Sequence, residues 1–143
     1  MNDHMLPTPR VAFPQVQGLG QTAAPESAYR TAYDLLERRA PKEALEVLEP
    51  ALEKDPDNTG LLSLRAWAYF IRVQLKHAQA DLERLVADNP TDDWAQHALG
   101  RCLERQSRYA EALPHLRLAA AMSGDWDYGL AVLRVEEHLN RGE

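Results

Sequence analysis

The fold of this chain is decided by residues 99–113, which read Leu-Gly-Arg-Cys-Leu-Glu-Arg-Gln-Ser-Arg-Tyr-Ala-Glu-Ala-Leu. Apolar residues recur in and around this stretch at helical spacing, which indicates helices that each bury one face. Small residues at Gly100 and Ala112 let two helices approach closely, and the larger Leu103 fills the space between them. The stretch therefore predicts the end of one helix and the start of a second helix packed against it.

The same pattern recurs along the chain at a fixed spacing of 34 residues, marked by Pro56, Pro90 and the helix terminator Gly124. A fixed period of this length indicates a repeat architecture. Four sets of residues keep the register without an insertion. They are Ala32, Ala66 and Gly100; Leu35, Tyr69 and Leu103; Ala44, Ala78 and Ala112; and Leu48, Leu82 and Leu116. No stretch alternates as a strand would, so three copies of one helical hairpin are expected.

This pattern resembles the tetratricopeptide repeat (TPR), a pair of antiparallel helices in each 34-residue unit. The resemblance implies an all-α fold, a helical-repeat solenoid of three helix-turn-helix repeats plus a C-terminal capping helix. The expected units are an N-terminal arm at 1–24, a TPR domain at 25–143, repeats at about 25–58, 59–92 and 93–126, and a capping helix at about 126–140. The expected helices run near 25–39, 41–54, 59–73, 75–88, 93–106 and 109–122 before the cap.

Several residues strain this pattern or remain open. Pro50 and Pro114 fall inside expected helices, where a proline removes a backbone donor and should produce a kink. Arg65 stands where the repeat usually has an apolar residue, and its side chain either reaches solvent or pairs with an acid. In the capping helix, Leu130 and Leu133 are expected to pack back on the third repeat.

Composition limits the classes of function. The 143 residues carry a formal net charge of -6, which argues against a nucleic-acid binder or a protein drawn to anionic membranes. The single cysteine excludes an internal disulfide, and nothing resembles a secretory signal or a membrane span, so a cytoplasmic location is expected. Arginine outnumbers lysine and alanine and leucine are abundant, a composition that hints at a bacterial source.

An enzyme is not expected, because no catalytic, phosphate-binding or dinucleotide motif is complete in the sequence. Cys102 lies within an expected helix beside small and apolar neighbours, so inert packing is the expected role. No histidine stands three or four residues from another histidine or from Cys102. We therefore expect no metal site and no cofactor.

The resemblance implies a concave groove lined by the first helix of each repeat, where members of the family bind peptides. The residues expected to bind a peptide there are Tyr29, Tyr33, Leu36, Trp67, Phe70, Trp94, His97 and Arg101. A stripe of aromatic residues at helical spacing is also typical of a buried core, so burial of several of them is the alternative. The clamp of lysine, asparagine and arginine with which some members hold the acidic C-terminus of heat-shock chaperones is missing. Its slots hold Tyr29, Tyr33, Leu64, Trp94 and Ala98.

These features predict a protein–protein interaction adaptor that binds an extended, largely apolar peptide segment in the groove. The ligand could carry an acid near Arg101, Arg105 and His97. The alternative is a structural or self-assembly module, in which the N-terminal arm or the edges of the array join copies into a homo-oligomer. RNA binding, known in other helical repeats, conflicts with the negative charge and the scarcity of lysine.

The N-terminal arm allows two interpretations. A segment so rich in proline and glycine is expected to be an unstructured tail when it is free, and this is the favoured reading. Its apolar residues Leu6, Val11, Phe13 and Val16 could instead dock in the aromatic groove, where prolines lower the entropy lost on docking. A docked arm would compete with the true partner.

Overall fold

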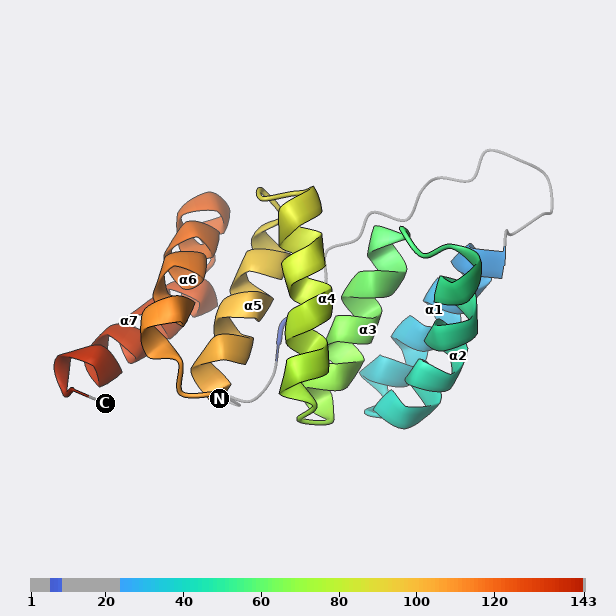
Figure 1. Cartoon of the computed structure of the whole chain (residues 1–143), viewed down its shortest axis with the longest axis horizontal. Coiled ribbons are helices and arrows are strands. Elements are labelled where there is room, and N and C mark those ends of the chain that lie inside the picture. The colour runs from blue at the N-terminus through green and yellow to red at the C-terminus, as the bar shows by residue number, and fades with distance from the viewer. Residues whose placement is uncertain (1–5, 9–23, 143) are drawn as a thin grey trace.

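The computed structural model describes residues 6–8 and 24–142, and this part of the chain contains seven helices and no strand (Figure 1). The helices are α1 (Ala24–Glu37), α2 (Pro41–Lys54), α3 (Thr59–Ile71), α4 (Leu75–Asp88), α5 (Asp93–Arg105), α6 (Tyr109–Ser123) and α7 (Trp126–Asn140). Their ends fall within one or two residues of the expected positions, which confirms the all-α helical-repeat fold. Among these helices, none combines the length and the apolar character that crossing a membrane requires.

Equivalent side-chain caps begin the first helices of the second and third repeats. The Oδ1 atom of Asn58 accepts a hydrogen bond from the backbone N–H of Leu61 at 3.0 Å. The Oδ1 atom of Asp92 accepts one from the backbone N–H of Ala95, also at 3.0 Å. Such a cap satisfies a backbone donor that the first turn of a helix leaves open. Because Asn58 and Asp92 are 34 residues apart, the sequence period also fixes where these helices start.

The turn inside each repeat contains one residue in the left-handed backbone region. These residues are Arg39, Val73 and Ser107, with φ angles of 62°, 60° and 59°. They are spaced 34 residues apart and none is a glycine, although side chains with a Cβ atom rarely adopt this conformation. Gly124 ends α6 in the same region at φ 68°, as expected for a terminator.

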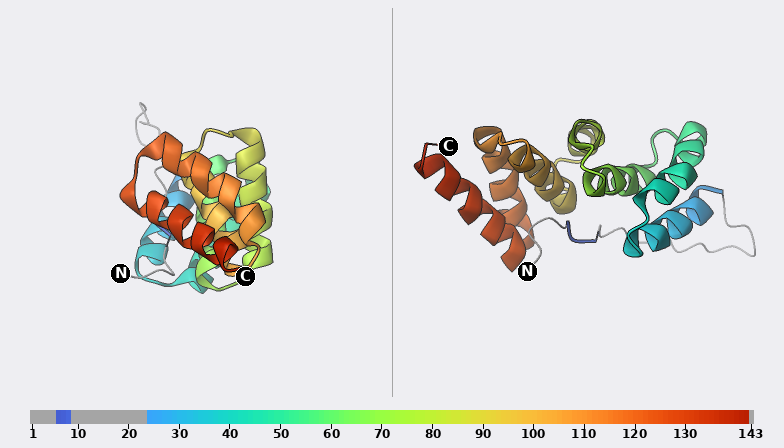
Figure 2. Two further views of the ribbon diagram at one scale, coloured as in Figure 1. Left: turned by 90° about the vertical axis from the view of Figure 1, so that its left-hand side faces the viewer. Right: turned by 90° about the horizontal axis from the view of Figure 1, so that it is seen from below.

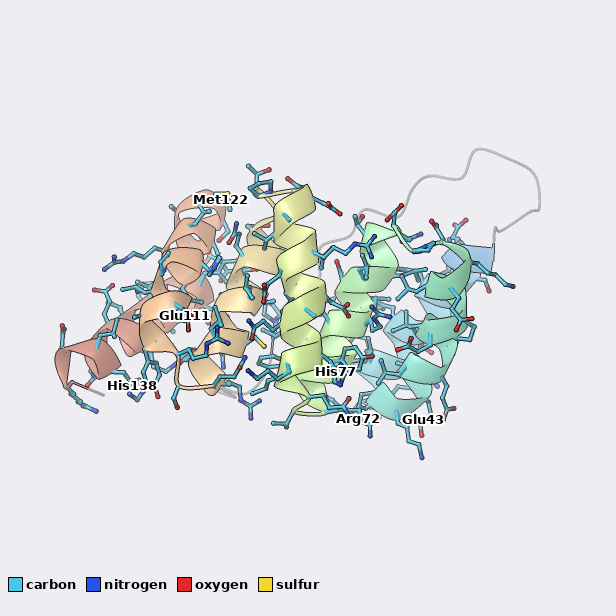
Figure 3. The ribbon with its side chains drawn as sticks, viewed as in Figure 1. Glu43, Arg72, His77, Glu111, Met122 and His138 are labelled. Carbon is cyan, nitrogen blue, oxygen red and sulfur yellow. The ribbon has the colours of Figure 1, made fainter. Side chains whose placement is uncertain are left out.

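The helices form two layers that bow into an arch (Figure 2). The first helices α1, α3 and α5 form the inner layer, and the second helices α2, α4 and α6 form the outer one. Most of the repeat positions expected to be core are completely buried between the layers, whereas Leu35 and Tyr69 are half-buried. The completely buried ones are Ala32, Ala44, Leu48, Ala66, Ala78, Leu82, Ala112 and Leu116. Figure 3 shows polar side chains such as Glu43, His77 and Glu111 on the outer helices.

Gly100 replaces the alanine of the other two repeats because α5 and α6 approach closely at this point. A Cβ atom built on Gly100 would lie 2.5 Å from the Cγ atom of Leu116. Atoms at that distance overlap, so a larger residue would push the two helices apart. The smallest residue of the register therefore lies where α5 meets α6.

The cap differs from the expectation in one residue. Tyr128, Ala131 and Val135 of α7 are buried, and their helical spacing places them on one face of the helix, toward the third repeat. Leu133 lies off this face and its side chain is 63% exposed, so its expected packing on the third repeat is wrong. Leu133 is apolar as the packing would require, but α7 packs on the array through the face that carries Tyr128, Ala131 and Val135.

The two helix-interior prolines do not interrupt their helices. Pro50 and Pro114 both lie inside continuous helices, α2 and α6, and both side chains are exposed. A carbonyl that loses its intrahelical partner on an exposed face can bond to water instead. The position of each proline on the outer surface therefore limits its cost.

Arg65 pairs with an acid, which settles the open alternative. Its Nε and Nη2 atoms donate to the two carboxylate oxygens of Asp81 at 2.8 and 2.7 Å. Its Nη1 atom donates to Glu49 at 3.3 Å, and the hydroxyl of Tyr69 donates to the same carboxylate at 2.9 Å. This bidentate geometry fits the planar guanidinium. The network joins α2, α3 and α4, with Asp81 buried and Tyr69 half-buried.

Candidate functional site

A run of aromatic side chains lines the inner layer. The rings of Tyr29 and Tyr33 on α1 are stacked with their centroids 6.1 Å apart. The ring of Tyr33 meets Trp67 on α3 edge to face at 6.2 Å. Both arrangements are favourable for aromatic pairs. Together with Trp94 on α5, these side chains form a surface, called here the aromatic face, on the first helices of all three repeats.

Residues 6–8 of the chain occupy this face. Leu6 is only 4% exposed and belongs to the same apolar cluster as Tyr29, Trp67 and Trp94. The indole Nε1 of Trp94 donates a hydrogen bond to the backbone carbonyl of Pro7 at 2.8 Å. The right-hand view of Figure 2 shows this short segment on the inner side of the arch, apart from the outer helices.

Thr8 adds a contact at the edge of the same face, where its side chain lies beside the hydroxyl of Tyr33. The favoured reading of the arm as an unstructured tail is therefore wrong for residues 6–8, because the burial of Leu6 and the hydrogen bond to Pro7 hold them. The other proposed anchors, Val11, Phe13 and Val16, lie outside the described residues.

Of the eight expected peptide-binding residues all but Tyr33 are buried, and two of them, Leu36 and Phe70, have no exposed surface. Leu36 and Phe70 are both 0% exposed, so neither can touch a ligand without a rearrangement of the helices. Phe70 lies between repeats, with the guanidinium of Arg105 5.4 Å from the centre of its ring. The physical reason is that α1 and α3 pack on each other and on the helices next to them in sequence, which leaves these two positions in the core. The alternative of a buried stripe holds for these two positions.

Tyr33 and Trp94 contact residues 6–8, and the rings of Tyr29 and Trp67 lie beside that of Tyr33. Tyr33 is half-buried, while Tyr29, Trp67 and Trp94 are buried. Burial and the neighbouring Tyr33 raise the pKa of Tyr29 to about 12, so its hydroxyl keeps its proton at neutral pH. The aromatic face therefore offers apolar surface and uncharged hydrogen-bonding groups.

The C-terminal end of the inner layer is already occupied by contacts within the protein. The ring of His97 on α5 stacks on Tyr128 of α7 with centroids 3.9 Å apart and planes inclined by 5°. Burial, with the charges of Arg101 and Arg134, lowers the pKa of His97 to about 3. His97 is therefore neutral and cannot supply a positive charge to a ligand near pH 7.

Arg101 is also engaged at this end. Its Nε atom lies 3.0 Å from a carboxylate oxygen of Glu104, and both side chains are buried. Arg134 of α7 donates to the same carboxylate at 2.8 Å. The expected acid-binding role of His97 and Arg101 is thus not supported, since one is neutral and the other is paired. Helical periodicity gives no sign that the long side chain of Arg134 crosses to a neighbouring helix.

Two buried polar atoms have no hydrogen-bond partner among the described residues. They are Nε1 of Trp67 and Nδ1 of His97. Most buried polar groups in proteins are hydrogen-bonded, so each exception calls for an explanation. The Trp67 donor belongs to the aromatic face, in the ring that meets Tyr33, and the Trp94 donor on the same face has a partner.

Cys102 packs in the core. It is buried, its Sγ atom donates to the carbonyl of Leu75 at 3.1 Å, and burial raises the pKa of its thiol to about 11. A thiol protonated at neutral pH is a poor nucleophile. Within residues 6–8 and 24–142, no three His, Cys, Asp or Glu side chains gather into a group that could hold a metal ion.

Known proteins share this architecture. A family model described as the Psidin N-terminal TPR repeats region matches residues 26–125. The chain is similar to the curated protein SGT1 homolog of Bos taurus, with 30% identity over 122 residues that make up 85% of this chain and 36% of that protein. It therefore spans little more than a third of the length of this relative.

Two solved structures resemble the chain closely in shape. The Sgt2 TPR domain from Aspergillus fumigatus has a TM-score of 0.78 at 19% identity, covering 86% of this chain and 83% of that one. The first TPR of Spaghetti (RPAP3), bound to the HSP90 peptide SRMEEVD, has a TM-score of 0.76 at 18% identity, covering 82% of this chain and 96% of that one. At such identities these likenesses establish the fold alone.

Proposed function

We propose, from the premise that this chain belongs to the tetratricopeptide-repeat family, that it is a non-catalytic adaptor for an extended, largely apolar segment of a partner protein. The segment lies along the aromatic face of α1, α3 and α5. The observation that carries this proposal is the position of residues 6–8, where Leu6 is buried and the carbonyl of Pro7 bonds to Trp94.

The aromatic face suits such a ligand for two reasons. Aromatic rings provide large apolar contact area with little conformational entropy to lose, which favours binding of an apolar side chain. Indole N–H groups bind backbone carbonyls, which are present in any extended segment. A face with both groups binds a peptide through its side chains and its main chain together.

The relatives support an interaction role, while the residues of this chain favour a different ligand from theirs. The Spaghetti (RPAP3) domain binds a peptide that ends in acidic residues. In this chain the slots of the family's clamp hold uncharged residues, including Tyr33, Leu64 and Trp94. Arg101, which could receive an acid, is paired with Glu104. An apolar segment therefore fits this face better than an acidic C-terminus.

The proposal is tested by replacing one tryptophan on the aromatic face and one away from it. Trp67→Ala should weaken binding of a partner captured from lysate by about 2 kcal/mol or more, because buried aromatic anchors dominate interfaces. Trp126→Ala is the matched control, since Trp126 is 78% exposed at the start of α7. Titration calorimetry measures the binding, and circular dichroism checks that both variants keep their helices.

A partner that binds the Trp67→Ala variant as tightly as the unmodified chain would remove the aromatic face from consideration. Equal losses for Trp67→Ala and Trp126→Ala would also contradict the proposal, because only one of the two residues belongs to that face.

The exposed apolar residues at the C-terminal edge favour a second candidate, self-assembly. Trp126 and Leu133 are exposed, and they border a hollow with Gly129 and Leu130. Contiguous exposed apolar surface often marks an interface. Sedimentation equilibrium of the unmodified chain and of Leu133→Asp tests this role. A mass that matches one copy for both proteins at all concentrations would exclude it.

A further inference from the structure

Residues 6–8 are fixed to the helices by a buried side chain and by polar contacts. Leu6 is as well buried as Trp67 in the same cluster. The hydrogen bond from Trp94 reaches the carbonyl of Pro7 across 87 positions of the sequence. Thr8 contacts Tyr33 on α1, so the three residues touch helices of the first and third repeats. The segment therefore contacts both the first and the third repeat on the inner side of the array.

The chemistry of this segment specifies what the site accepts. Leu6 supplies a branched, buried apolar side chain to the hydrophobic core. Pro7 has a fixed φ angle and no backbone N–H. It therefore leaves no backbone donor without a partner when the segment lies on an apolar surface. Pro7 itself is exposed, which shows that its carbonyl is the part engaged by the protein. The recognised unit is therefore leucine followed by proline in an extended backbone.

Occupation of the site by residues 6–8 is incomplete. Trp94 donates to the segment, but the indole Nε1 of Trp67 has no partner among the described residues although it is buried. A buried donor without a partner raises the free energy of the protein. A segment that offers carbonyls to both tryptophans would satisfy a donor that residues 6–8 leave open.

We infer that the aromatic face is a recognition site for extended leucine–proline segments of a partner protein, and that residues 6–8 occupy it until such a segment displaces them. This inference rests on the proposed peptide-binding function and names the class of ligand. Displacement is favourable because the partner makes the same contacts as Leu6 and Pro7 and adds a hydrogen bond to Trp67. The chain's own segment also blocks ligands too weak to replace it.

A synthetic peptide tests the inference. The probe is a fluorescein-labelled peptide copying residues 3–11, titrated by fluorescence anisotropy into the full-length chain and into its Leu6→Asp variant. A charged side chain at Leu6 should undock the native segment, so the peptide should bind the variant at least about tenfold more tightly than the unmodified chain. Leu133→Asp makes the same change at an exposed leucine and should leave binding at the unmodified level.

Two outcomes would overturn the inference. Equal binding to the unmodified chain and to Leu6→Asp would show that residues 6–8 do not occupy the site. Absence of binding to Leu6→Asp would show that the site does not recognise this segment. A peptide carrying aspartate in place of its leucine must fail to bind either protein.

The tryptophans give a second measurement that does not depend on the folding of Leu6→Asp. In the unmodified chain labelled with ¹⁵N, excess probe peptide that carries a nitroxide in place of fluorescein should broaden the indole signal of Trp94 and leave that of Trp126 unchanged. In the Leu6→Asp background, where the native segment is undocked, Trp94→Phe keeps the ring and removes the donor, so it should weaken the peptide about tenfold, the cost of one hydrogen bond. An unchanged affinity would contradict the assigned bond to Pro7.

Failure of this inference can be separated from failure of the proposed function. If a captured partner depends on Trp67 yet binds the unmodified chain and Leu6→Asp equally, only the inference is wrong. If the partner is indifferent to Trp67→Ala, the proposed function is wrong as well. Trp67→Phe should weaken the partner while leaving the probe peptide unaffected, because only the partner uses that donor.

Discussion

Helices α3 and α5 occupy equivalent places in successive repeats, but they are held by different kinds of contact. The buried side chains of α3 are almost all apolar, and Leu61, Leu64 and Phe70 are completely buried. Helix α5 also buries the polar residues Gln96, His97 and Arg101. One backbone design therefore accommodates an apolar interface and a polar one.

The polar contacts of α5 join it to the helices that follow. The side-chain oxygen of Gln96 accepts a hydrogen bond from Nδ1 of His115 on α6 at 2.8 Å. His97 stacks on Tyr128 of α7, and Glu104 pairs with Arg134 of α7. These contacts tie the cap to the third repeat, so the C-terminal end of the array has few groups to offer a ligand.

The polar contacts of α3 point outward instead. Arg65 bonds to Asp81 on α4 and Glu49 on α2, away from the aromatic face. The inner side of α3 is thereby left to Trp67, which takes part in the aromatic face. The difference between the two helices teaches that an outward polar network leaves α3 an apolar inner surface for the proposed ligand.

The largest expected effect comes from deleting the leucines that pack each hairpin. Leu82→Ala and Leu116→Ala should each lower the free energy of unfolding by about 2 to 5 kcal/mol, because a cavity remains. The loss should be greater for Leu116, which lies against Gly100 where no Cβ atom can fill the space. Urea unfolding followed by circular dichroism measures both values.

Gly100→Ala tests the same contact between Gly100 and Leu116 from the other helix. Alone it should destabilise the protein, because its Cβ atom would overlap Leu116. In the Leu116→Ala background it should recover stability by filling the cavity. Losses below about 1 kcal/mol for the leucine variants, or simple additivity with Gly100→Ala, would reject the packing described.

The next effect concerns the polar interface of α5. The pKa of His97 is about 3 in the folded protein, below its value of about 6.5 in an unfolded chain, so the unfolded state takes up the proton first. Its contribution to stability is complete above about pH 6.5 and is lost as the pH falls toward 3. Between about pH 7 and pH 5 this should lower the free energy of unfolding by about 2 kcal/mol.

His97→Phe is the matched variant, since phenylalanine keeps a ring against Tyr128 and cannot be protonated. Its free energy of unfolding should vary less over the same pH range, while acidic groups common to both proteins contribute equally. Parallel pH profiles for the two proteins would mean that His97 is not held neutral by burial.

The smallest expected effect lies in the turns that follow α3 and α5. Val73 follows α3 with a β-branched side chain at φ 60°, while Ser107 follows α5 at φ 59°. Val73→Gly should raise the free energy of unfolding by about 0.5 to 1 kcal/mol, because glycine adopts this region without strain. Ser107→Gly should raise it less, since serine has no β-branch. Thermal unfolding of both variants checks the order, and destabilisation by Val73→Gly would refute it.

The sequence by itself determined the architecture of this protein. The 34-residue spacing of Ala44, Ala78 and Ala112, with Leu48, Leu82 and Leu116 one turn later, placed the helices and the buried layer between them. This information is local and repeated, because each residue need only pack within its own hairpin or against the next one. An atypical residue in one repeat therefore does not hide the pattern, because the other two repeats keep it.

Only the tertiary structure decided which inner residues belong to the core and which form the aromatic face. Leu36 and Phe70 have the same helical spacing as surface residues, but the approach of neighbouring helices buries them. Likewise, no spacing rule joins Glu104 to Arg134 or His97 to Tyr128, because these pairs form across separate helices. The place of Leu6 and Pro7 depends on Trp94, a residue far along the chain that comes near only when all three repeats are stacked.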